Sequence, residues 1–131
     1  MRFAMQDVKS PRTHRIRAAV TLTLAIIADD LTGALDAAAP FAGRGLRTEV
    51  ALSPDATAAA IASGATVVAI STNSREIAPE DARRAVAETL AALPPGTPLF
   101  KKVDSRMKGN IAAELSAFAP GPLLVAPAIP D

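Results

Sequence analysis

The sequence predicts an α/β fold in three layers, with a mostly parallel sheet that carries helices on both faces. Short apolar runs alternate along the chain with helical segments, and continuous apolar runs are typical of parallel strands that are buried on both sides. Half of the 131 residues are hydrophobic, which excludes an intrinsically disordered chain. Because Cys is absent and His14 is the single His, we expect neither a disulfide scaffold nor a metal site built from thiolates or several histidines.

The first strand is expected within the apolar run 18–28. Arg15 and Arg17 precede this run, as in a signal peptide. The run is rich in β-branched residues, however, and at eleven residues it is shorter than the ~20 that a membrane span requires. We therefore favour a buried strand, with residues 1–20 as a basic, flexible extension and residues 21–131 as the body of the domain.

The charge is distributed unevenly between these two parts. The overall net charge is +1, but residues 1–20 carry five basic and one acidic group, which leaves a net charge of −3 on the other 111 residues. A slightly acidic body with 3% aromatic residues is a poor nucleic-acid binder. We expect no nucleic-acid partner, no membrane association and a cytoplasmic location.

Helix caps and chain breakers delimit the remaining elements. Thr32 is expected to cap the first helix, and Pro79 opens the third, where two acids favour the helix N-terminus. The expected helices are 33–42, 56–62, 79–93 and 109–118, and the expected strands after the first are 47–52, 66–71, 99–103 and 122–126. No helix follows the fifth strand, so the domain is expected to be incomplete at the C-terminus.

Polar residues follow the strands at the edge where parallel α/β sheets bind ligands. Asp29 and Asp30 come directly after the first strand. Such acids can accept hydrogen bonds from substrate hydroxyls, act as a general base or bind Mg²⁺. Either acid could instead be only a helix cap, but two acids beside Thr32 exceed what one helix needs. We therefore interpret the pair as functional.

Two further loops contribute cations. Arg75 follows the third strand and suits a carboxylate or phosphate, although it could also be a solvated arginine paired with Glu76. After the fourth strand, Lys102 and Asp104 should share one side of the extended chain and Lys101 the other. These residues could form a solvated basic turn, but alternation requires one of the two lysines to face inward. Together the loops predict a small, hydroxylated, anionic ligand.

Four motifs in order resemble the N-terminal, sugar-acid-binding domain of the four-carbon acid sugar kinase family, over about residues 22–131. They are DDLTGA at 29–34, TNSR at 72–75, KKVDS at 101–105 followed by Gly109-Asn110, and VAPAIP at 125–130. The resemblance implies ATP-dependent phosphorylation of threonate, erythronate or oxo-tetronate. It also implies the substrate-binding residues, with Asp30 as the candidate catalytic group; these are Asp29, Asp30, Arg75, Lys102, Asp104 and Ser105.

The chain departs from the family pattern in two ways. It has Arg106 where the family has Thr, and Lys108 where the family has Arg. Family members are also far longer, and the sequence contains neither G-x-x-x-x-G-K-[ST] nor G-x-G-x-x-G after a strand. The resemblance therefore implies that ATP and Mg²⁺ are held by a C-terminal ATP-binding domain outside this chain. Without that domain, this chain is expected to be inactive.

Two other interpretations remain open at this stage. A receiver-like signalling domain shares the size and the acid pair, but it needs an Asp after the third strand, where the chain has 71–73 (STN), and a Lys after the fifth, where Pro127 lies. The chain could also be a non-catalytic fragment that only binds a small anionic ligand.

Overall fold

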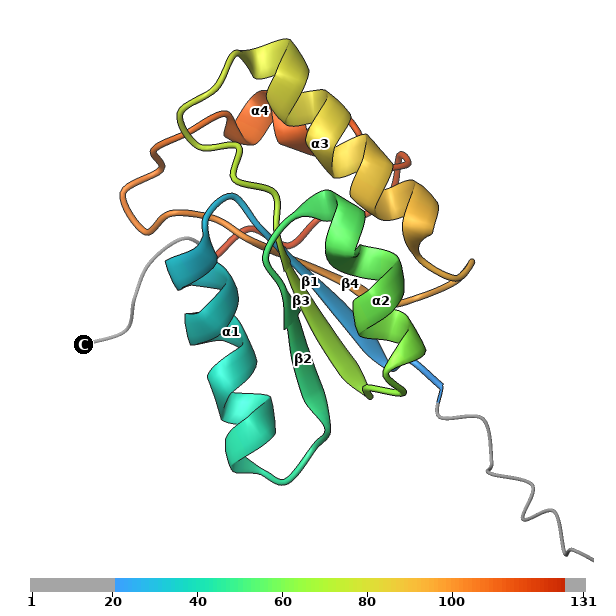
Figure 1. Ribbon diagram of the computed structural model, residues 1–131. Coiled ribbons are helices and arrows are strands. Elements are labelled where there is room, and N and C mark those ends of the chain that lie inside the picture. The colour runs from blue at the N-terminus through green and yellow to red at the C-terminus, as the bar shows by residue number, and fades with distance from the viewer. Residues whose placement is uncertain (1–20, 127–131) are drawn as a thin grey trace, which may run out of the picture.

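The computed structural model describes residues 21–126 and confirms the α/β fold (Figure 1). Four parallel strands form one sheet in the order β2-β3-β1-β4. The strands are β1 (Leu24–Ala28), β2 (Thr48–Ala51), β3 (Val67–Ser71) and β4 (Leu99–Lys102). The helices are α1 (Leu31–Gly43), α2 (Thr57–Ala62), α3 (Pro79–Ala92) and α4 (Ile111–Leu115), with a 3₁₀ turn η1 (Pro54–Ala56) before α2.

The expectations for residues 1–20 and for the end of the VAPAIP motif lie outside the described residues. Within the described part of the chain, every helix is too short or too polar to cross a membrane.

The core lies in two layers, one on each face of the sheet. Ala34 and Ala38 of α1 pack against Ala28 and Ala69 on one face. On the other face, residues of β1, β2 and β3 pack with Ala60 of α2. Many of the buried hydrophobic residues are alanines. Helices with alanine at the contact can approach the sheet closely, because no long side chain separates the two backbones.

The expected fifth strand is wrong. Residues 122–126 form no strand, and Leu124 is 92% exposed. A strand needs backbone partners, and Pro120 and Pro122 provide no N–H group for a ladder. The apolar run in PLLVA predicted a buried strand, but its side chains are exposed, and β4 is the edge of the sheet that the structure describes.

The strand order excludes the receiver-like interpretation. Receiver domains have the order 2-1-3-4-5, whereas here β3 lies between β2 and β1. The chain leaves β1 through α1 toward β2, and it leaves the neighbouring β3 through α3 toward β4, in the opposite direction. Such a reversal between adjacent strands creates the crevice in which α/β sheets bind ligands, so the loops after β1 and β3 lie at the expected place for a site.

Candidate functional site

The acid pair after β1 divides into one buried and one accessible carboxylate. Asp29 is 2% exposed, while the Asp30 side chain is 30% exposed. Asp30 caps α1, because its extended backbone places Oδ1 2.8 Å from the backbone N of Gly33. The expectation that Thr32 is the cap is therefore wrong: Thr32 lies inside the first turn of the helix. Capping occupies one Asp30 oxygen and leaves the other directed toward Arg75.

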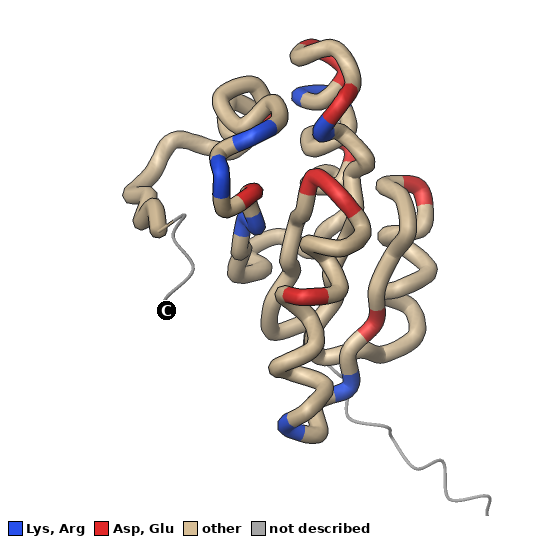
Figure 2. The backbone as a smooth tube through the Cα atoms, turned by 90° about the vertical axis from the view of Figure 1, so that its left-hand side faces the viewer, with Lys and Arg blue, Asp and Glu red and all other residues tan. Residues whose placement is uncertain are grey.

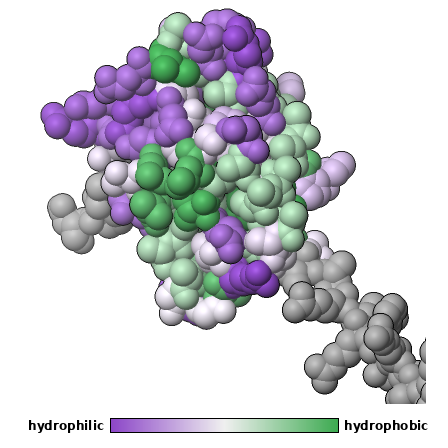
Figure 3. Space-filling model, viewed as in Figure 1, coloured by the Kyte–Doolittle hydropathy of each residue, from purple (hydrophilic) through white to green (hydrophobic). Residues whose placement is uncertain are grey.

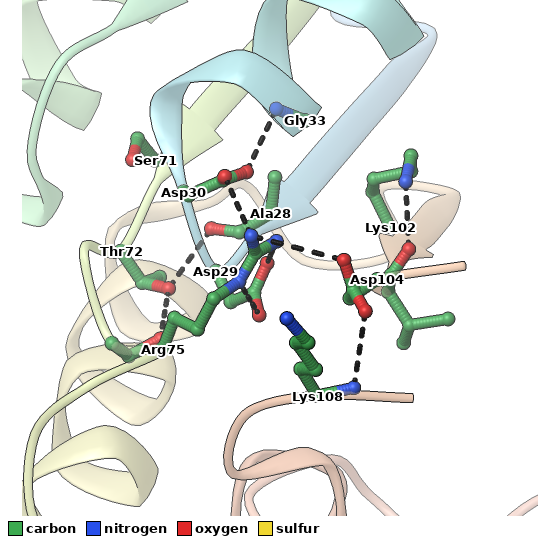
Figure 4. A network of polar contacts seen from close by, with 12 residues as sticks. Ala28, Asp29, Asp30, Gly33, Ser71, Thr72, Arg75, Lys102, Asp104 and Lys108 are labelled. Atoms are coloured by element: carbon green, nitrogen blue, oxygen red, sulfur yellow. Dashed lines mark hydrogen bonds and ion pairs between the residues drawn. The ribbon is translucent and has the colours of Figure 1, made fainter. Parts of the chain in front are cut away.

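Arg75 connects the loop after β3 to both acids, as Figure 4 shows. Its Nε and Nη2 donate to the two carboxylate oxygens of Asp29 at 3.0 and 2.9 Å. Its Nη1 lies 3.0 Å from Asp30 Oδ2 and 3.8 Å from Asp104 Oδ1. The hydrogen bonds to Asp29 raise the pKa of the Arg75 guanidinium further above its ordinary value. Arg75 therefore pairs with the site acids, and not with Glu76 as in a solvated loop.

Gly109 lies directly against the Asp29–Arg75 ion pair. Its φ of +91° lies in the left-handed region that favours glycine. A Cβ at this position would lie 2.9 Å from Asp29 Oδ2 and 3.3 Å from Arg75 Cγ. The loop before α4 thus approaches the ion pair with backbone alone, and no larger residue fits there without displacing one of the two partners.

The loop after β4 contributes Asp104 and Lys102. Asp104 Oδ2 accepts hydrogen bonds from the backbone N–H groups of Lys108, at 3.2 Å, and Arg106, at 2.9 Å. The bond from Lys108 is the main reason why the pKa of the Asp104 carboxyl is below its ordinary value. Lys102 Nζ donates to the carbonyl oxygen of Val103 at 2.6 Å. Figure 4 also shows the side chain of Lys108 pointing toward the acids.

Lys101 takes the opposite direction from Lys102, as strand alternation predicts. Its Nζ lies 2.8 Å from Glu114 Oε2, and both side chains are buried. The other oxygen of Glu114 accepts a hydrogen bond from the Ser74 hydroxyl. Glu114 was not among the site residues predicted from the sequence, because one acid in a short helix is indistinguishable from a solvated residue. The only available signal was that strand alternation turns one of the two lysines inward, because a buried ammonium group needs an anionic partner.

Asn110 joins the start of α4 to the loop after β3. Its side-chain amide donates to the carbonyl oxygens of Ser74 and Ile77 at 2.9 and 2.8 Å. The sequence predicted a helix over 109–118, whereas α4 is shorter, Ile111–Leu115, with Asn110 directly before its first residue. This clamp holds the segment that contains Arg75 close to the loop that contains Gly109.

Of the six predicted site residues, the structure joins four through Arg75: Asp29, Asp30, Asp104 and Arg75 itself. Lys102 lies beside them, with its Cγ 3.4 Å from the position of a Cβ at Gly33, and Ser105 lies in an exposed turn. Figure 2 shows the basic segment after β4 opposite the acidic turn after β1. The rim therefore offers cations and carboxylates to a small ligand with hydroxyl and acid groups.

The surroundings of this rim are mixed in character. In the view of Figure 3, a strongly hydrophilic surface lies at the upper left and a hydrophobic patch lies directly below it. Within residues 21–126, no group of three or more His, Cys, Asp or Glu side chains is arranged to hold a metal ion. The three acids that do converge are instead paired with a single cation, Arg75.

Fold and site together define a parallel α/β domain with a charged site at the C-terminal ends of its strands, and comparison with known proteins gives its family. The model of the family described as the sugar-binding N-terminal domain matches residues 24–131, and the chain belongs to this family.

Its relatives include a D-threonate kinase of Cupriavidus necator, 47% identical over 111 residues that cover 80% of this chain and 26% of that protein. A D-erythronate kinase of Heliobacterium modesticaldum is 39% identical over 94 residues, which cover 70% of this chain and 21% of that protein. The chain thus spans about a quarter of the length of the curated relatives that it matches.

A crystal structure of a domain of unknown function from Bordetella bronchiseptica, with bound citrate and described as a domain-swapped dimer, has the same fold. It superimposes with a TM-score of 0.60 at 37% identity, covering 72% of this chain and 25% of that one.

Proposed function

We propose that this domain binds the sugar acid in an ATP-dependent kinase for four-carbon sugar acids of the threonate or erythronate type. The observation that carries the proposal is the network of three carboxylates around Arg75 at the C-terminal ends of the strands. The names of the relatives support the substrate class, since two of them are a D-threonate kinase and a D-erythronate kinase. The citrate in the Bordetella structure is likewise a hydroxylated carboxylic acid.

In this proposal the two adjacent acids have different roles. Asp29 is buried and both of its oxygens bind Arg75, so it holds the arginine in place and does not contact the substrate. Asp30 is the accessible acid, and its Oδ2 faces the rim beside Arg75. Asp30 orients the acceptor hydroxyl and takes its proton as a general base.

The carboxylate of the substrate needs cations at the same rim. Lys102 lies next to the first turn of α1, and its ammonium group can exchange the carbonyl of Val103 for a substrate carboxylate. Arg75 lies at the same rim, where it is already paired with Asp29, Asp30 and Asp104. The exposed Ser105 hydroxyl can bond a substrate hydroxyl or acid oxygen. Asp104 orders the turn between these groups through two backbone N–H bonds.

ATP and Mg²⁺ do not fit the residues that the structure describes. These residues contain no phosphate-binding loop motif and no cluster of metal-ligating side chains. We assign both to the remaining length of a complete kinase, since the chain covers 26% of the Cupriavidus enzyme. The contribution of this domain to phosphoryl transfer is to bind and orient the acceptor.

The test is calorimetric titration of the chain with D-threonate and D-erythronate, with threitol and erythritol as neutral analogues. At least one acid should bind more tightly than its polyol. Lys102→Met should lower the affinity for that acid roughly tenfold to a hundredfold, as expected for the loss of one charge-assisted hydrogen bond. The control is Arg84→Gln, which removes an exposed cation on α3 that pairs with Asp81 and not with the site acids.

Equal binding of acid and polyol, or no binding of either acid, would refute the proposal. An equal loss of affinity in the Lys102 and Arg84 variants would show that the effect is one of net charge, and would remove Lys102 from the site.

A further inference from the structure

We infer that Glu114 is a positioning residue, which fixes the loops after β3 and β4 in the arrangement that the sugar-acid site requires. The inference rests on the proposed function and adds to it a residue that does not touch the ligand. Glu114 is fully buried on α4, outside the network around Arg75, and it is the only buried acid besides Asp29 among the described residues.

Each oxygen of Glu114 holds one of the two loops. Oε1 accepts a hydrogen bond from Ser74, the residue directly before Arg75. Oε2 pairs at 2.8 Å with Nζ of Lys101, the residue directly before Lys102. One carboxylate therefore sets the distance between the two segments that present the cations of the site.

The contacts continue from Ser74 to the end of β1. The Thr72 hydroxyl lies 2.6 Å from the Ser74 hydroxyl and 2.9 Å from the carbonyl oxygen of Ala28, and its one proton can be donated to either of these two oxygens. Ala28 is the residue directly before Asp29. A connected series of buried polar groups thus runs from Glu114 to the acid pair.

Stability alone is a weak explanation for this arrangement. A buried ion pair must recover the large desolvation free energy of two charges, and replacement by apolar residues of similar volume is often neutral or stabilising. Lys101 and Glu114 have exposed side-chain fractions of 6% and 1%, so they belong to this class of pair. What apolar residues could not provide is the hydrogen bond to Ser74 and a fixed separation between the two loops.

The experiment compares Glu114→Gln with the double variant Lys101→Met/Glu114→Leu. The double variant removes both charges, keeps the volume and should melt close to the unmodified chain. Amide hydrogen exchange of residues 72–78 and 101–108 is measured by mass spectrometry, with D-threonate and D-erythronate affinity as the second readout. The control is Glu88→Gln, which changes an exposed acid on α3.

For a positioning residue, both variants should exchange at least about tenfold faster in both segments, the effect of losing one contact to a buried carboxylate. Sugar-acid affinity should fall by a similar factor, even in the thermally stable double variant. The control should match the unmodified chain in both readouts.

Two results would overturn the inference. One is a double variant that equals the unmodified chain in melting temperature, in amide protection of both loops and in sugar-acid affinity. The ion pair would then be merely structural. The other is a Glu114→Gln variant in which only α4 exchanges faster. Because exchange is measured without ligand, it decides the positioning role even if the unmodified chain binds no sugar acid, a result that would instead refute the proposed function.

Discussion

Gly109→Ala should destabilise the protein far more than the same change at Gly96. Both glycines have a positive φ, +91° and +77° respectively, so both substitutions strain the backbone by about 1–2 kcal/mol. Only at Gly109 does the new Cβ meet other atoms, with Asp29 Oδ2 at 2.9 Å and Arg75 Cγ at 3.3 Å, whereas at Gly96 nothing lies within 4 Å. Gly96 is therefore a matched control for the backbone strain.

The difference between the two variants isolates the effect of crowding the ion pair. Overpacking of a tight site costs about 1–3 kcal/mol, so we expect Gly109→Ala to lose about 2 kcal/mol more than Gly96→Ala. For a chain of this size that corresponds to a difference in melting temperature of about 8 °C.

Urea unfolding should be followed by far-ultraviolet circular dichroism, because the chain has neither Trp nor Tyr as an intrinsic fluorophore. Equal losses of unfolding free energy in the two variants would refute the close approach of Gly109 to the Asp29–Arg75 pair. The variant should also bind sugar acids more weakly, since its crowded atoms belong to the network that holds Asp30.

Three other outcomes follow from the same contacts. Asp29→Asn should lower the free energy of unfolding by about 1–3 kcal/mol, measured in urea, because Arg75 loses its bidentate anionic partner and keeps only Asp30 and Asp104. Asn110→Ala should lower it by about 1–2 kcal/mol and speed amide exchange in the loop after β3, since two loop carbonyls lose their donor. The pKa of Asp104 is lowered in the folded state, chiefly by the backbone N–H of Lys108, so its ionised form stabilises the fold at neutral pH. That contribution should vanish as the pH falls below about 4 through the folded pKa, and Asp104→Asn should differ from the unmodified chain only above that range.

The sequence could predict most of the fold because the evidence for it is local. The central strands β1 and β3 are short, mostly apolar runs, LAIIA and VVAIS, and glycine or proline lies in the connections between the strands. The prediction failed at residues 122–126, where an apolar run met no partner strand. Hydropathy describes a side chain's preference for burial, whereas a strand also requires a neighbouring backbone, which no local pattern reports.

The candidate site was predictable in position but not in its pairing. Parallel topology alone brings the ends of β1, β3 and β4 to one edge, so the residue types at those ends indicated a site. Arg75 pairs with Asp29, which lies 46 positions away in the sequence. This pairing depends on side-chain geometry that exists only in the folded chain. Glu114 was missed for the same reason, since its partners lie 13 and 40 positions away in the sequence.

The alanine-rich layer between α1 and the sheet has a consequence for the accuracy of the site. Ala34 and Ala38 are buried against Ala28 and Ala69, and alanine has no side-chain rotamers to lose or to exchange. At these four positions the distance between helix and sheet is therefore set by backbone atoms and methyl groups. Asp30 is the N-cap residue of this helix and lies directly before its first turn. The accessible acid thus takes its position from main-chain contacts, so substitutions that enlarge these alanines should displace it even though none of them touches the ligand.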